Sequence, residues 1–220
     1  MTDKEILSHI DHTLLKAVST WPEIQKLCDE AVKFGTASVC VPPSYVKRIK
    51  ERYPALNICT VIGFPLGYNP GEIKAAEAAQ AVAEGANEVD MVVNLGDVKN
   101  GDFARVTAEI GAVRKAIGAK TLKVIIETCY LTDEEKISLC HSVTEGGANY
   151  IKTSTGFGTG GAKIEDIRLF KKHIGPGIKI KAAGGVKTRE DLELFLKEGC
   201  DRIGTSSAVA LLAGAAAAGY

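Results

Sequence analysis

The stretch Ile58-Cys59-Thr60-Val61-Ile62 is followed by Asn69-Pro70-Gly71-Glu72, by Gly85 and by Glu88-Val89-Asp90-Met91-Val92-Val93. The two apolar runs are rich in β-branched residues, which is typical of strands buried on both faces. Between them, Asn69 offers a helix N-cap, Pro70 a first helical residue and Gly85 a left-handed helix end. This stretch therefore predicts a strand–helix–strand unit with parallel strands.

The same pattern recurs along the whole chain. Thr132 with Glu135, and Thr188 with Asp191, have the spacing of capping boxes. Further helix ends are expected at Gly35, Gly118, Gly146 and Gly199. The expected strands are residues 10–14, 37–41, 58–62, 88–93, 122–127, 150–152, 178–182 and 202–204.

Eight such units in 220 residues leave about 27 residues for each strand, helix and pair of loops. We therefore predict a single domain over residues 1–220, an α/β fold of the (β/α)8 TIM-barrel type with a short extra N-terminal helix. The first strand is the least regular of the eight. If residues 10–14 were a loop, the alternative would be an open sheet of seven strands.

Composition excludes several classes of protein. The chain has 27 Lys and Arg against 27 Asp and Glu, without a basic cluster, so we expect no nucleic acid partner. Its longest small apolar run, 208–219, is too short to cross a membrane. The six cysteines form no C-x-x-C pair, and His9 and His12 have no further ligands near them in sequence, so we expect reduced thiols, a cytoplasmic protein and no metal site.

Charged residues inside apolar strands are the candidates for chemistry, because a buried charge costs several kcal/mol unless it is paired or functional. In a barrel of this type the active site lies at the carboxyl ends of the strands. We therefore expect the substrate to be met there by Asp11, Thr13, Cys40, Lys123 and Thr155, near residues Asp90, Glu127, Lys152 and Lys181.

Lys152 and Lys181 fall on neighbouring predicted strands. A free lysine has a pKa near 10.4, but a second ammonium about 4 Å away would bring the pKa of one amine to about 7 to 8. An amine in that range can form a Schiff base. The alternative is that each lysine simply forms an ion pair, with Asp90 or Glu127 as the partner. Asp90 itself would either neutralise a lysine or shuttle protons, and the two roles are compatible.

A phosphate site is expected where the loops after strands seven and eight meet. Gly184 and Gly185 follow the seventh strand, and Ser206 and Ser207 follow the eighth. The alternative is a tight turn with an ordinary Ser cap. The run 156–161 matches G-x-G-x-x-G, but the next strand ends without the acid that would bind a ribose, so we interpret the run as an active-site loop.

Taken together, these residues resemble the deoxyribose-phosphate aldolases, class I aldolases with a (β/α)8 barrel. The resemblance covers essentially the whole chain. It rests on the stretches IDHTLL (10–15), VIGFPLG (61–67), EVDMV (88–92), LKVIIET (122–128), YIKTSTGF (150–157) and KIKAAGGV (179–186).

The resemblance implies that Lys152 is the Schiff-base lysine, Lys181 the second lysine and Asp90 the proton shuttle. Gly184, Gly185, Ser206 and Ser207 would hold the phosphate of 2-deoxy-D-ribose 5-phosphate, which is cleaved to acetaldehyde and D-glyceraldehyde 3-phosphate. It also implies no cofactor, a dimer or tetramer, and a terminal tyrosine that reaches the site in some members, here Tyr220. Two alternatives remain: an isomerase or epimerase without a covalent step, and a phosphosugar-binding protein without activity.

Overall fold

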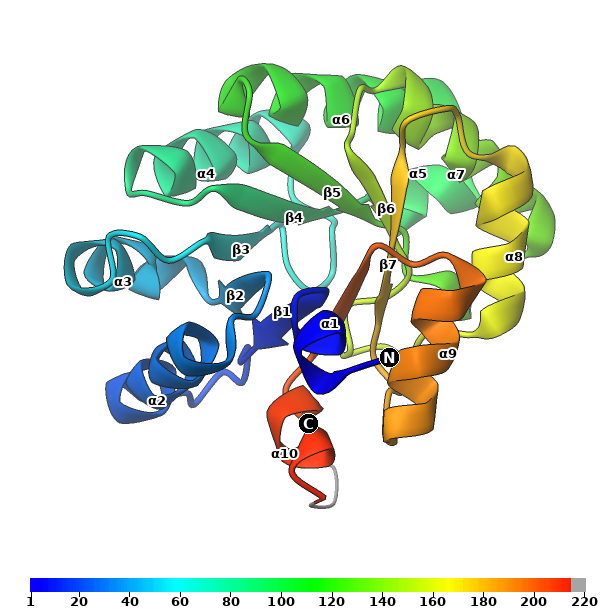
Figure 1. The fold of residues 1–220 in the computed structure, drawn as a ribbon. Coiled ribbons are helices and arrows are strands. Elements are labelled where there is room, and N and C mark those ends of the chain that lie inside the picture. The colour runs from blue at the N-terminus through cyan, green and yellow to red at the C-terminus, as the bar shows by residue number, and fades with distance from the viewer. Residues whose placement is uncertain (215–220) are drawn as a thin grey trace.

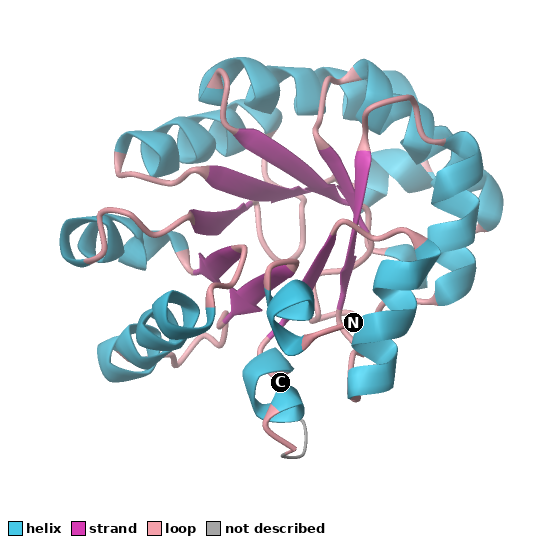
Figure 2. Ribbon diagram, viewed as in Figure 1, coloured by secondary structure: helices cyan, strands magenta, loops and turns pink. Residues whose placement is uncertain are grey.

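The computed structural model describes residues 1–214, which form a closed barrel of eight parallel strands surrounded by helices (Figures 1 and 2). The strands follow one another around the barrel in sequence order, as the (β/α)8 prediction requires. The strands are β1 (Ile10–Thr13), β2 (Ser38–Val41), β3 (Ile58–Ile62), β4 (Glu88–Val92), β5 (Thr121–Ile125), β6 (Tyr150–Lys152), β7 (Lys179–Ala183) and β8 (Arg202–Thr205).

Helices connect the strands and cover the outside of the barrel (Figure 2). No helix in the described part of the chain is long and apolar enough to cross a membrane. The α-helices are α1 (Asp3–Leu7), α2 (Trp21–Phe34), α3 (Val46–Arg52), α4 (Gly71–Ala83), α5 (Leu95–Lys99), α6 (Phe103–Ile117), α7 (Asp133–Glu145), α8 (Ile164–His173), α9 (Arg189–Glu198) and α10 (Ala208–Leu212), and the short 3-10 helices are η1 (Pro43–Tyr45) and η2 (Thr128–Tyr130).

The first strand closes the barrel. Asp11 on β1 lies opposite Ser38 on β2 and also opposite Gly204 on β8. Because β1 pairs on both sides, the alternative of an open seven-stranded sheet is wrong. The expected extra helix, α1, precedes β1 and buries Ile6 and Leu7 in the core.

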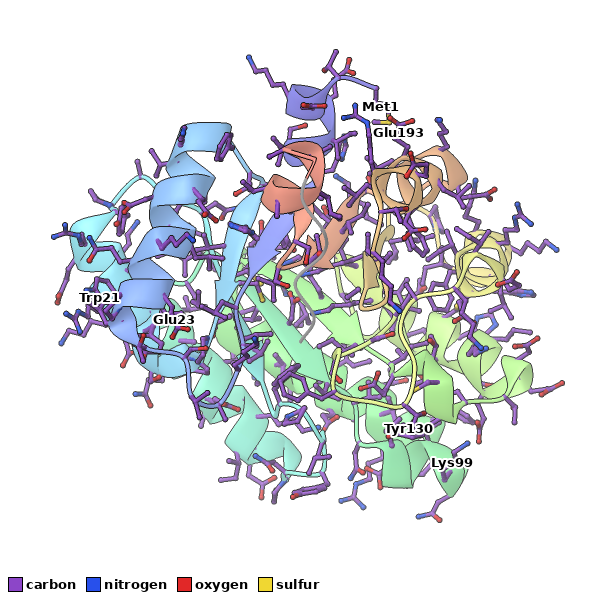
Figure 3. All side chains as sticks on the ribbon, turned by 90° about the horizontal axis from the view of Figure 1, so that it is seen from below. Met1, Trp21, Glu23, Lys99, Tyr130 and Glu193 are labelled. Carbon is purple, nitrogen blue, oxygen red and sulfur yellow. The ribbon has the colours of Figure 1, made fainter. Side chains whose placement is uncertain are left out.

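The two ends of the barrel are seen in Figure 3. Met1 lies near Glu193 toward one end, with 3.9 Å between its amino group and the carboxylate, while Lys99 and Tyr130 lie toward the other. Lys99 and Tyr130 belong to segments that follow β4 and β5, so their end is the one at which the strands finish. The active site of a (β/α)8 enzyme is expected at this end.

Successive side chains of a strand point to opposite faces, so each strand places alternate residues in the barrel interior and against the surrounding helices. On β4, Val89 and Met91 belong to the apolar core, whereas Glu88 and Asp90 point into the barrel and meet charged partners. The continuous apolar core between strands and helices therefore leaves the barrel interior free for polar groups.

Two local predictions need correction. Helix α4 begins at Gly71, so Pro70 rather than Asn69 is its N-cap. At the end of α7, Gly146 keeps a right-handed conformation because its N–H still binds Ser142 O at 2.9 Å, and the left-handed residue is Gly147. The two predicted capping boxes, which begin at Thr132 and Thr188, are confirmed.

Candidate active site

Charged side chains from six strands meet inside the barrel. Four of them, at Asp11, Asp90, Lys123 and Lys181, are fully buried, and Lys152 is 3% exposed. Such groups are stable in a protein interior only when each is paired. We call this set the charged cluster; it consists of Asp11 on β1, Glu88 and Asp90 on β4, Lys123 on β5, Lys152 on β6, Lys181 on β7 and Arg202 on β8.

Asp90 is the centre of the charged cluster. Its Oδ2 accepts hydrogen bonds from Lys152 Nζ and from Lys181 Nζ, each at 2.7 Å, and its Oδ1 accepts one from Lys123 Nζ at 2.9 Å. Lys152 and Lys181 also lie opposite each other in the β6–β7 register. The two lysines predicted to be neighbours are therefore brought together, with a shared carboxylate oxygen between their nitrogens.

The charged partners of Asp90 explain its ionisation state. Burial alone would favour the neutral carboxylic acid, but the ammonium groups of Lys123, Lys152 and Lys181 outweigh burial and hold the pKa of Asp90 well below its usual value. Asp90 is therefore a carboxylate, and the ion pair that the sequence offered as an alternative for Lys152 is present in this structure.

Lys181 and Lys123 have further carboxylates of their own. Lys181 Nζ lies 2.5 Å from Asp11 Oδ2, and Lys123 Nζ lies 2.5 Å from Glu88 Oε2. Burial would lower the pKa of each lysine, but these carboxylates and Asp90 outweigh burial and raise the pKa of both above the usual value. Both therefore remain cations across the physiological pH range.

Lys152 has the fewest carboxylate partners among the three lysines of the charged cluster. The other six members are three carboxylates and three cations, so they are neutral as a set. Within the cluster Lys152 contacts only Asp90, whereas Lys181 and Lys123 each lie close to more than one carboxylate. Loss of a proton from Lys152 would thus leave a buried cluster without net charge.

Glu127 anchors the loop that follows β6 and interacts with Lys152 only through longer-range electrostatic attraction. It lies beyond the end of β5, in a left-handed conformation with φ of 53°, so the predicted strand 122–127 ends earlier. Its carboxylate accepts hydrogen bonds from the amide and the hydroxyl of Thr155, and Thr155 Oγ1 in turn accepts one from Phe157 N at 2.9 Å. Burial raises the pKa of Glu127, and the hydrogen bonds from Thr155 counter only part of that rise.

A cavity of about 360 Å³ opens beside the charged cluster, between the loops after β6, β7 and β8. Four residues predicted to bind phosphate, Gly184, Gly185, Ser206 and Ser207, line it, together with most of the 156–161 loop. Gly204 is also in its wall, where a Cβ would lie 3.1 Å from Lys181 Cε, so the cavity borders the cluster.

The glycines of the cavity are required by its geometry. Gly184 and Gly185 have φ of 75° and 76°, a region that L side chains rarely adopt. At Gly161, a Cβ would lie 2.4 Å from the carbonyl carbon of Gly184, so the two loops touch through their backbones. The 156–161 loop, interpreted from the sequence as an active-site loop, does form a wall of the cavity.

Two other residues predicted to contact the substrate, Thr13 and Cys40, do not line the 360 Å³ cavity. Thr13 Oγ1 donates to Asp11 O at 2.7 Å and lines a separate pocket beside α2, whereas Cys40 is fully buried next to Cys59. His12 Nε2 lies 2.8 Å from a carboxylate oxygen of Glu30, and His9 Nδ1 lies 2.8 Å from Asp201 O. Tyr220 lies outside the described residues.

Sequence reasoning missed four residues of this region. Glu88 stands two positions before Asp90 on the same face of β4, and Arg202 begins β8, so charge within a strand could have revealed both. Cys59 Sγ lies 3.1 Å from Asp90 Oδ1. Lys187 is the one charged side chain that lines the 360 Å³ cavity among the described residues, and its place after the Gly184-Gly185 pair was the available signal.

Comparison with known proteins gives a consistent result. The profile described as "DeoC/LacD family aldolase" matches residues 6–217. A deoxyribose-phosphate aldolase of Clostridium botulinum (strain Alaska E43 / Type E3) is 63% identical over 221 aligned positions, with 100% of both chains covered. One of Clostridioides difficile (strain 630) is 57% identical, with 95% of this chain and 96% of the relative covered.

Solved structures agree in fold and sequence. The structure titled "QR15, an Aldolase" has a TM-score of 0.91 at 36% identity and covers 96% of this chain and 95% of its own. A deoxyribose phosphate aldolase of Aeropyrum pernix, described as having a unique tetrameric structure, has a TM-score of 0.90 at 32% identity. The match covers 97% of this chain and 92% of the Aeropyrum pernix chain.

Proposed function

The chain belongs to the DeoC/LacD family of aldolases, and from this premise we propose that it cleaves 2-deoxy-D-ribose 5-phosphate reversibly to acetaldehyde and D-glyceraldehyde 3-phosphate through a Schiff base on Lys152. The observation that carries the proposal is that Lys152 and Lys181 share Asp90 Oδ2 beside the glycine-lined cavity. An amine, a fixed cation and a carboxylate in contact are what a covalent aldol cleavage requires.

In the proposed reaction the neutral amine of Lys152 attacks the C1 aldehyde, and loss of water from the carbinolamine gives an iminium. A base then takes the proton of the C3 hydroxyl and the C2–C3 bond breaks. Its electron pair moves toward the iminium nitrogen to form an enamine, while C3 becomes the aldehyde carbon of the departing D-glyceraldehyde 3-phosphate. Protonation of the enamine at C2 and hydrolysis release acetaldehyde and restore the amine. Because the lysine nitrogen accepts the electrons, the reaction needs neither metal nor organic cofactor.

Asp90 is the proposed proton carrier, acting directly or through a water molecule. Its pKa is held low by three ammonium groups, one of which is that of Lys152. When Lys152 loses its charge, one of the three causes disappears, so the basicity of Asp90 rises at the stage when a proton must be moved. The 2.7 Å contact with Lys152 Nζ puts Asp90 within reach of the carbinolamine.

Lys181 is the proposed permanent cation beside the nucleophile. Asp11 and Asp90 keep it protonated, so it can disfavour a charge on Lys152 and stabilise negative charge that develops on the substrate oxygens. Lys123 is ion-paired with Asp90 and Asp11 with Lys181, which supports an action of Lys123 and Asp11 through these two partners.

The proposed phosphate site is the 360 Å³ cavity. The backbone of Gly184 and Gly185 can approach a phosphate closely, and Ser206 and Ser207 provide hydroxyl groups. Lys187 supplies a positive charge. The hydrogen bond from Thr155 to Glu127 fixes the loop that follows β6. Thr13 and Cys40 belong to β1 and β2 at the same end of the barrel.

We also propose a homo-oligomer acting in the cytoplasm. The first part is supported by the tetrameric Aeropyrum pernix relative, and the second by the six cysteines, which are all free thiols.

Reductive trapping tests the proposal. Incubation with acetaldehyde and borohydride should add an ethyl group to Lys152, which peptide mass spectrometry would locate. An isomerase or epimerase without a covalent step would remain unmodified, and a silent phosphosugar-binding protein would release no acetaldehyde from the substrate. Ethylation of another lysine, with Lys152 unmodified, would contradict the assignment.

A further inference from the structure

Two thiols meet beside Asp90 inside the barrel. Cys40 on β2 lies opposite Cys59 on β3. The two Sγ atoms and a carboxylate oxygen of Asp90 all lie within 4.8 Å of one another, and all three residues are fully buried. The proposed aldol cleavage uses neither thiol as a nucleophile or a base.

We propose that Cys40, Cys59 and Asp90 form a binding site for a soft divalent cation of the Zn²⁺ or Cd²⁺ class, and that occupation of this site inhibits the enzyme. Thiolate and carboxylate ligands lie about 2.0 to 2.3 Å from Zn²⁺ in a tetrahedral arrangement, which separates ligand atoms by a little under 4 Å. Ligand atoms already within 4.8 Å reach that arrangement by small side-chain rotations.

Charge does not oppose the binding, although three lysines surround Asp90. The cation brings two positive charges, and coordination releases the protons of both thiols. The net charge of the region is therefore the same before and after the exchange. Because the cation must displace the thiol protons, it will bind more tightly as the pH increases.

Lys123 contacts two of the three proposed ligands. Its Nζ lies 2.9 Å from Asp90 Oδ1 and 3.2 Å from Cys59 Sγ. It also lies 2.5 Å from Glu88 and 3.6 Å from Asp11. Lys123 can therefore move toward these two carboxylates and remain paired when Asp90 Oδ1 turns to the cation.

The thiols lie next to a pocket at the end at which the strands finish. Cys40 and Cys59 pack with Leu15 and Val61, and Phe64 lies against this group. Leu15, Val61 and Phe64 also line a pocket of about 240 Å³. The thiols thus lie behind a pocket wall rather than deep in the continuous core between strands and helices.

A second triad, Asp11, Cys59 and Glu88, has equally close ligand atoms but is a poorer site. It offers one thiol instead of two. Soft cations prefer thiolate, so the pair of cysteines selects the first triad.

Occupation of the site removes Asp90 from the reaction. A carboxylate bound to a cation no longer accepts a proton from Lys152, and loss of a general base of this kind lowers the rate by about 10²-fold or more. This inhibitory effect rests on the proposed function, whereas cation binding by the two thiols does not.

Titration with Cd²⁺ tests both parts. We expect one Cd²⁺ per chain with ultraviolet absorption from Cd–thiolate bonds, release of about two protons per Cd²⁺, and inhibition of about 10²-fold that a chelator reverses. Cys59→Ala should lose the absorption. Cys129→Ser is the matched control and should keep it, because Cys129 is the half-exposed cysteine and lies outside the triad.

A measurement on the unaltered protein covers the case in which Cys59→Ala folds poorly. The ¹¹³Cd resonance should lie in the range of two sulfur ligands. A resonance typical of oxygen and nitrogen ligands alone, or absorption that is lost in Cys129→Ser, would overturn the site. Full activity of the Cd²⁺-loaded protein would overturn the inhibitory role while leaving the Schiff-base proposal to its own trapping test.

Discussion

Lys152 and Lys181 direct their ammonium groups to the same oxygen, Oδ2 of Asp90, and each nitrogen lies 2.7 Å from it. The difference between the two lysines is in their other partners. Lys181 also lies 2.5 Å from Asp11, whereas Lys152 has no second carboxylate within the charged cluster. This asymmetry separates a lysine that can become neutral from one that stays charged, and the following predictions depend on it.

Lys152→Met should abolish aldol cleavage, with a loss on the order of 10⁴-fold or more, because the nucleophile is removed. The fold should remain stable, since the other six members of the charged cluster are neutral as a set. Acetaldehyde release and chemical denaturation measure the two effects. Appreciable cleavage by this variant would disprove the role of Lys152.

Lys123→Met is the matched comparison for stability. It removes a fully buried cation that lies close to Asp11, Glu88 and Asp90, whereas Lys152 contacts Asp90 alone within the charged cluster, so we expect a loss of about 3 to 5 kcal/mol in the free energy of unfolding. Urea denaturation of this variant and of Lys152→Met should give clearly different midpoints. Equal midpoints would mean that the number of carboxylate partners does not set the cost of removing a lysine.

Lys181→Leu should shift the pH dependence of Schiff-base formation. Without a permanent cation beside it, the amine of Lys152 holds its proton to a higher pH, so half-maximal trapping with acetaldehyde and borohydride should move upward. The rate of ethylation measured across pH tests this expectation. An unshifted profile would show that Lys181 does not act electrostatically.

Asp90 should make the protein sensitive to acid. Because its pKa in the folded state is lowered, its contribution to stability is present above the usual carboxyl pKa near 3.9 and is lost as the pH falls through the folded value. The free energy of unfolding should therefore decrease between about pH 5 and pH 2. In Asp90→Asn this decrease should be shallower, and an identical slope in both proteins would argue against a charged Asp90.

Lys187→Met should weaken binding of the phosphate group and leave the chemistry intact. Loss of a charged hydrogen bond to a phosphate corresponds to a KM about tenfold or more higher for the phosphorylated substrate. Non-phosphorylated 2-deoxyribose serves as the control substrate, and its kinetics should be unchanged. An equal effect on both substrates would place the role of Lys187 outside phosphate recognition.

Much of the fold was predictable from the sequence. The repeated apolar runs and helix caps predicted eight strands, each within one residue of its observed bounds except 122–127, which extended two residues past β5. These features depend on neighbours within a few positions, so the local sequence contains them. Gly146 and Asn69 were misplaced by one position because the last turn and the first turn of a helix admit alternative ends.

The candidate site was only half predictable. The sequence by itself determined that Asp90, Lys152 and Lys181 are charged residues on strands, and hence that they need partners or a function. Only the tertiary structure decided which partners they have. Asp11 meets Arg202 because closure of the barrel puts β1 beside β8, at a separation of 191 residues. Pairing at that distance depends on the register of every intervening strand, and no local pattern records it.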